Sequence, residues 1–138
     1  MSSKKRTPLE EITDRLLTLY LINRIQPCSD LGDTKLQKLV FLSELDMLDN
    51  KTKGFDFHFY KFLHGPFSKQ LEKDLAMLDT LGLYLPDEYM LTSHGRKVVE
   101  WLSDLWERNS EIVGFIDRTL DTHGDVSLEV IKSRVYIM

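Results

Sequence analysis

The sequence predicts a single mainly helical domain of the α+β class, with a small β component in its middle. Apolar residues recur at helical spacing along most of the 138 residues. Strict alternation of apolar and polar residues is confined to 55–61, and two short strand-like pieces follow within 83–91. The length suits one domain, and 42% hydrophobic with 29% charged residues is ordinary for a globular protein.

Two helices are expected before the alternating segment. The first runs from about Leu9 to Arg24, because Pro8 suits its first turn. Its expected apolar face consists of Leu9, Ile12, Leu16, Leu17, Tyr20 and Leu21. The second begins at Thr34, whose hydroxyl we expect to cap it in a capping box with Gln37. Apolar residues cover more than half of its circumference between 36 and 45, which predicts a central, buried helix.

The middle of the chain predicts a strand, a helix and a hairpin. Residues 55–61 alternate, so a half-buried strand is expected there, with Phe55, Phe57 and Phe59 on one face. Gly65 ends this strand, and Pro66 is expected at the first position of a third helix with a C-cap at Gly82. Segments 83–85 and 89–91 then form a tight hairpin around 86–88.

Three more helices complete the prediction. Thr92 or Ser93 caps a helix that reaches about residue 107, and Asn109 or Ser110 caps the next. The segment 123–125 breaks that helix, and Ser127 caps a last one that runs nearly to the end. A helix followed by a hairpin and another helix is typical of a winged helix, in which the helix before the hairpin reads DNA. We therefore expect a winged-helix-like core at about 9–106 and extra helices at about 107–138.

Charge and composition exclude several classes of protein. The net charge is −4, and residues 55–138 hold 14 acidic against nine basic side chains, unlike a strong nucleic-acid binder. The basic cluster Lys4, Lys5 and Arg6 predicts a solvated tail or, alternatively, an arm that contacts phosphates. No apolar stretch is long enough to span a membrane, so no membrane partner is expected. The single Cys28 fits a reducing cytoplasm, which is the expected location.

Motifs for catalysis are missing from the sequence. Phosphate-binding glycine loops and nucleophile elbows are absent, and the histidines lack metal-binding spacing, so we expect no enzyme, metal or cofactor. A solvated surface explains acidic residues such as Asp56 and Asp74 more simply than acid–base catalysis does. Trp101 and Trp106 lie five residues apart, so either both are buried or one faces a partner, and a homodimer is one such partner.

Two segments of the chain are similar to a known family. The run Thr-Lys-Leu-Gln-Lys-Leu at 34–39 resembles the same segment of SocA-like Panacea antitoxin domains. Residues 60–75, with His-Gly-Pro-Phe-Ser at 64–68, resemble the family's Tyr/Trp-x-x-Gly-Pro segment. With Leu-Thr-Ser-x-Gly at 91–95, the resemblance covers about 9–106. One departure from an ordinary winged helix is that the expected first strand follows the second helix rather than the first.

The resemblance implies a non-catalytic, intracellular module that neutralises a toxin-like partner protein by direct contact. The expected protein interface consists of Tyr60, Lys61, His64, Phe67, Ser68 and Lys69. The alternative is a winged-helix transcriptional regulator that binds DNA through Ser68, Lys69, Gln70 and Lys73. The expected recognition helix lacks arginine, and Asp87 and Glu88 at the hairpin tip would repel phosphates, so protein contact is favoured over DNA contact.

Overall fold

Helices and two short hairpins make up the structure, a computed structural model that describes residues 5–25, 31–62 and 65–137. The elements are α1 (Pro8–Arg24), α2 (Asp33–Asp49), β1 (Tyr60–Phe62), β2 (Gly65–Phe67), α3 (Lys69–Thr80), β3 (Tyr84–Leu85), β4 (Met90–Leu91), α4 (Ser93–Trp101), α5 (Ser103–Arg108), α6 (Ser110–His123) and α7 (Leu128–Ile137). The strands form two separate antiparallel pairs, with Tyr60 opposite Phe67 and Tyr84 opposite Leu91. The prediction of a mainly helical class with a small β component is confirmed.

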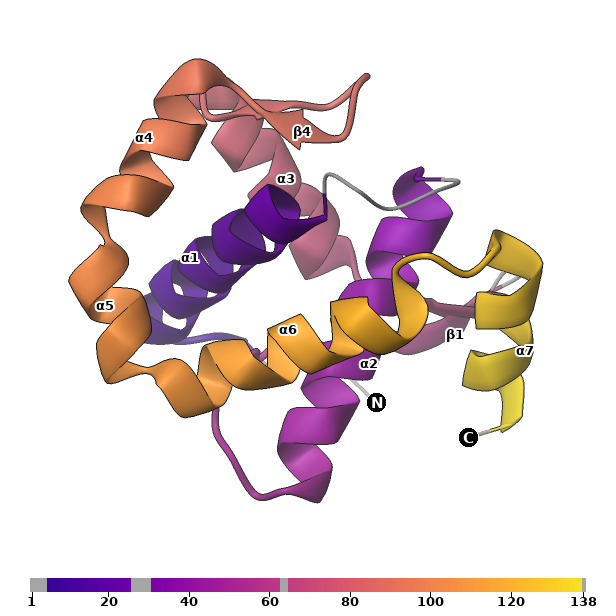
Figure 1. Cartoon of the computed structure of the whole chain (residues 1–138). Coiled ribbons are helices and arrows are strands. Elements are labelled where there is room, and N and C mark those ends of the chain that lie inside the picture. The colour runs from indigo at the N-terminus through magenta and orange to yellow at the C-terminus, as the bar shows by residue number, and fades with distance from the viewer. Residues whose placement is uncertain (1–4, 26–30, 63–64, 138) are drawn as a thin grey trace.

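The core lies around α2, as predicted. Figure 1 shows that α6 crosses α2 and that α1 runs beside α3 and α4, while α7 follows beyond the C-terminal end of α6 and contacts α2. Leu36, Leu39 and Val40 of α2 are buried, and so are Leu21 and Ile22 of α1. None of the helices in the described part of the chain has the length and apolarity that crossing a membrane requires.

The buried face of α1 differs from the predicted one. Leu9 is 73% and Ile12 is 53% exposed, so the prediction that these two residues face the core is wrong. The buried face of α1 instead consists of residues that recur three or four positions apart, and two of them are polar. It includes Asp14, Leu17, Thr18, Leu21 and Ile22. Leu9 and Ile12 lie on the opposite side of the helix from Asp14, because each residue advances the helix by about 100°. The helix begins with a capping box between Thr7 and Glu10.

The start of α2 also differs from the prediction. The helix begins at Asp33 with Gly32 as N-cap and without a side-chain cap, so the capping box of Thr34 and Gln37 is wrong. The Gln37 amide is used elsewhere, because its Nε2 donates to the carbonyl of Ser68 at 3.0 Å and its Oε1 accepts from the N–H of Ser68 at 2.9 Å. Gln37 thereby joins α2 to the residue that precedes α3.

The segment before the first hairpin is only partly the predicted strand. Phe55 and Phe57 are buried as expected, but strand pairing begins only at Tyr60. The N–H groups of the preceding residues are bonded to side chains instead: Asp56 to Asp14 Oδ1, Phe57 to Glu44 Oε1 and His58 to Gln70 Oε1, each at 2.7 Å. Buried N–H groups need an acceptor, and here polar side chains replace the missing partner strand.

Pro66 does not open a helix, which corrects another prediction. It lies in β2 opposite Lys61, and α3 begins three residues later at Lys69. Ser68 is the N-cap of α3, where its hydroxyl accepts from the N–H of Leu71 at 3.2 Å. The far end of α3 lies one residue before the predicted C-cap: Leu81 is the C-cap, Gly82 follows with a positive φ of 76°, and Leu83 N–H bonds to Leu78 O.

The remaining helices largely match the prediction. Thr92 caps α4 by accepting from the N–H of Gly95 at 2.9 Å, and Ser127 accepts from the N–H of Val130 at 3.3 Å. The helix expected to reach residue 107 is divided at Leu102 into α4 and α5. Asn109 precedes α6 without capping it, since its amide donates to Leu105 O instead.

Candidate functional site

Four of the predicted interface residues lie together at the β1–β2 hairpin, and we call them the hairpin surface: Tyr60, Lys61, Phe67 and Lys69. The rings of Tyr60 and Phe67 meet edge to face with centroids 5.9 Å apart, and Lys69 Nζ lies 5.9 Å from the centre of the Tyr60 ring. Lys61 and Lys69 are exposed, whereas the two rings are half-buried. His64, also predicted for this interface, lies outside the described residues.

Ser68 and Gln70 do not lie on an open surface. Ser68 is fully buried as the N-cap of α3, so the prediction that it faces a partner or DNA is wrong. Gln70 is half-buried and its Oε1 accepts from the N–H of His58. Lys69 and Lys73 are exposed, so two of the four residues predicted to contact DNA remain available to a ligand.

A buried ionic cluster lies beside residues 56–57, which precede the hairpin. Arg6 Nη1 contacts Asp14 Oδ2 at 2.9 Å and Asp74 Oδ2 at 2.7 Å, and Arg15 Nε lies 3.2 Å from Asp74 Oδ1. The Arg6 guanidinium also lies over the ring of Phe57, 5.4 Å from its centre. Arg6 is therefore neither a solvated tail nor an arm for phosphates, and the prediction of a solvated Asp74 is wrong as well.

Two buried carboxyl groups, Asp14 within this cluster and Glu44 near it, have raised pKa values. Burial raises the pKa of Asp14 to about 7, although the hydrogen bonds from Arg6 and from the N–H of Asp56 lower it. Burial also raises the pKa of Glu44 to about 8, opposed by its hydrogen bond from the N–H of Phe57. Glu44 has no ion pair with any described residue, so burial dominates its titration. Both groups hold the backbone of 56–57 in place.

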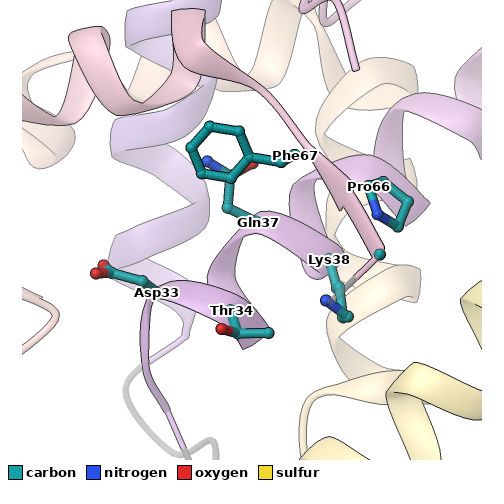
Figure 2. Close-up of a pocket in the computed structure, with 7 residues that line it drawn as sticks. Asp33, Thr34, Gln37, Lys38, Pro66 and Phe67 are labelled. Atoms are coloured by element: carbon teal, nitrogen blue, oxygen red, sulfur yellow. The ribbon is translucent and has the colours of Figure 1, made fainter. Parts of the chain in front are cut away.

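Two hollows flank the hairpin. The first has a volume of about 160 Å³ and lies between the first turns of α2 and strand β2. Figure 2 shows the side chains around it, which are those of Asp33, Thr34, Gln37, Lys38, Pro66 and Phe67. The second is about 260 Å³ and is lined by Phe41, Phe59, Tyr60, Lys61, Gly65, Pro66 and Val135. Gly65 and Pro66 of β2 line both hollows, and Tyr60, Lys61 and Phe67 of the hairpin surface each line one of them.

The sequence analysis did not predict that two lysines of α2, Lys35 and Lys38, are buried. Lys35 Nζ donates to the carbonyls of Gly124 at 2.6 Å and Val126 at 3.0 Å, so it ties α2 to the connection between α6 and α7. Lys38, one turn later, is also buried and lines the first hollow. The sequence contained no local signal for this burial, because the acceptors of Lys35 lie about 90 residues away along the chain.

The other predicted features are dispersed. Trp106 packs on Tyr20 with ring centroids 5.0 Å apart, whereas Trp101 is 70% exposed. Histidines 94 and 123 lie near Trp101 and Arg134, respectively. Among the described residues, no three metal-ligating side chains come together, and Cys28 lies outside those residues.

Comparisons with known proteins give no relative. The chain matches no protein-family model, no curated protein and no solved structure. What the protein does is therefore inferred from the hairpin surface and from the resemblance carried by segments 34–39 and 60–75.

Proposed function

We propose that the protein is a non-catalytic, intracellular binding module, similar to Panacea antitoxin domains, that neutralises a partner protein by direct contact. The observation that carries this proposal is the hairpin surface, where Tyr60 and Phe67 lie edge to face beside the ammonium of Lys69. Aromatic residues are enriched at protein interfaces and account for much of their binding energy. Lys61 adds a second cation, so an acidic partner surface fits best.

The backbone around the hairpin surface is held by side chains, which favours a binding role. Gln70 fixes the N–H of His58, and Gln37 fixes both backbone groups of Ser68. The hairpin is therefore held at both ends: His58 before it is bonded to Gln70 of α3, and Ser68 after it is bonded to Gln37 of α2. A surface that is already ordered loses less conformational entropy on binding than a flexible loop does.

Co-expression with a toxin-like partner tests this function. We would express the chain with the product of the neighbouring gene and measure growth together with co-purification. The double variant Lys61→Glu and Lys69→Glu should abolish growth and co-purification, because it places negative charge opposite an acidic partner surface. Both lysines are exposed, so the core is unchanged. The double variant Lys97→Glu and Arg108→Glu, which makes the same charge change at exposed residues of α4 and α5, away from the hairpin surface, should keep both growth and co-purification. If the native chain neither suppresses toxicity nor co-purifies with that product, the proposal fails.

A winged-helix regulator that binds DNA is the second candidate. The exposed Lys69 and Lys73 near the start of α3 favour it. Against it stand the burial of Ser68, the hydrogen bond of Gln70 to the backbone and the exposed acidic tip of the β3–β4 hairpin. Binding to genomic duplex DNA at about 50 mM and about 200 mM salt distinguishes the candidates, because binding through phosphates weakens sharply over this range. Strong, salt-sensitive binding would place the regulator first.

A further inference from the structure

Lys38 is a buried lysine that lines the hollow between α2 and β2. Its side chain is 1% exposed, and it forms no hydrogen bond or ion pair with any residue that the structure describes. Lys35 is just as buried but donates to two carbonyls. An unpaired buried charge is unfavourable, and burial together with the nearby ammonium of Lys132 lowers the pKa of Lys38. A positive charge in this position therefore calls for an anion.

Lys38 also lines a cavity with room for a ligand. The hollow between α2 and β2 measures about 160 Å³, and a cavity of ~150 Å³ is known to hold benzene. Figure 2 shows Thr34 and Lys38 of α2 on one side of it and the rings of Pro66 and Phe67 on the other. The α2 N-terminus lies beside it without a side-chain cap, and its partial positive charge also favours an anion.

We infer that this cavity binds a carboxylate attached to a small apolar group. The Lys38 ammonium and the Thr34 hydroxyl would hold the carboxylate, and the rings of Pro66 and Phe67 would contact the apolar part. One ammonium matches the single charge of a carboxylate, whereas the exposed Asp33 at the same hollow disfavours a doubly charged phosphate. The Gln37 amide takes no part, because Ser68 occupies both of its ends.

A titration with benzoate tests the cavity and does not depend on the proposed antitoxin role. Benzoate combines one carboxylate with a ring that fits the volume, and benzamide is its uncharged counterpart. The ¹⁵N-labelled protein should show saturable shifts at α2 and β2 with benzoate, weaker ones with acetate and none with benzamide. The absence of saturable shifts with benzoate, or equal shifts with benzamide, would overturn the inference.

Variants assign the binding to Lys38. Lys38→Met should weaken benzoate binding by about tenfold or more, because it removes a charge-assisted hydrogen bond. It should also raise the melting temperature of the free protein, because an unpaired buried charge disappears. Thr34→Val should weaken binding less, and the exposed Lys97→Met is the control that should leave it unchanged. Benzoate affinity in Lys38→Met equal to that of the native chain would refute the assignment.

A peptide comparison separates the two sources of such a carboxylate. A short peptide that ends in phenylalanine is titrated with a free and with an amidated C-terminus. Binding of the free form alone identifies the terminal carboxylate of a protein as the ligand. Binding of benzoate without either peptide identifies a free carboxylic acid. If Lys38→Met does not fold, Thr34→Val decides the question. Benzoate affinity in Thr34→Val equal to that in the control Lys97→Met would then mean that benzoate binds outside the cavity, and the inference would be rejected.

Discussion

Replacing the buried Glu44 with glutamine should make the protein more stable at alkaline pH. Glu44 is buried in α2, accepts a hydrogen bond from the N–H of Phe57 at 2.7 Å, and has no ion pair with a described residue. Burial raises its pKa from 4.5 to about 8. In Glu44→Gln, the side-chain oxygen can still accept from Phe57, but the group no longer ionises.

The sign and size of the effect follow from this pKa. Below pH 4.5 the carboxyl is protonated in both the folded and the unfolded chain, so its full contribution to stability is present. As pH rises to about 8, only the unfolded chain releases the proton, and the free energy of unfolding falls. At ~1.36 kcal/mol per pKa unit, a rise from 4.5 to about 8 corresponds to at most about 5 kcal/mol. The new amide N–H groups lack acceptors and cost ~1–3 kcal/mol at every pH.

Urea unfolding of both proteins between about pH 5 and pH 9, followed by far-UV circular dichroism, measures this difference. The variant should be equal to or less stable than the native chain at the acid end and about 2 kcal/mol or more stable at the alkaline end. Glu100→Gln, an exposed residue of α4, controls for the loss of one negative charge. A stability difference between Glu44→Gln and the native chain that stays constant with pH would show that Glu44 is ionised in the folded state and would refute the reasoning.

Four further substitutions test other parts of the fold. Arg6→Met should lower the free energy of unfolding by about 3–5 kcal/mol, because the buried Asp14 loses its cation and the buried Asp74 keeps only Arg15, and a loss below ~1 kcal/mol would contradict the buried cluster. Trp106→Ala should cost about 2–4 kcal/mol, whereas the exposed Trp101→Ala should cost under ~0.5 kcal/mol. A homodimer through Trp101 predicts that Trp101→Ala sediments as a monomer while the native chain does not. Gly95→Ala should cost about 1–3 kcal/mol in a thermal melt, because its Cβ would collide with the backbone carbonyl of Leu83, and an unchanged melting temperature would contradict that contact.

Local patterns predicted most helices correctly, because their signals lie within one or two turns. The left-handed turn at Gly82 after α3 and the N-caps at Thr92 and Ser127 depend only on neighbouring residues. The burial of Lys35 and Lys38 could not be predicted in this way, since lysines on a helix ordinarily face solvent. Their burial depends on α6, α7 and β2, which pack on α2 from distant parts of the chain.

The first hairpin was missed for a different reason. Proline lacks an N–H, so it suits the first position of a helix and a short edge strand equally well. Local sequence cannot decide between the two, and the structure places Pro66 in β2 opposite Lys61. The shift of the start of α3 to Lys69 then buries Ser68 as its cap. This single displacement removes Ser68 from both predicted interfaces, and it leaves Phe67 beside Tyr60.

Residues 55–59 alternate like a strand but have no partner strand, so polar side chains accept hydrogen bonds from their backbone N–H groups. Alternation indicates an extended backbone with one buried side, but it does not supply a partner for the backbone N–H groups. Asp14, Glu44 and Gln70 supply the acceptors here, so three polar residues, including Gln70 that was predicted to contact DNA, are committed to the scaffold. The polar groups left for a ligand near the hairpin are those without such a backbone commitment. Among the described residues, these include the exposed lysines of the hairpin surface, the Thr34 hydroxyl and the buried Lys38, which is why the proposed contacts are placed on them.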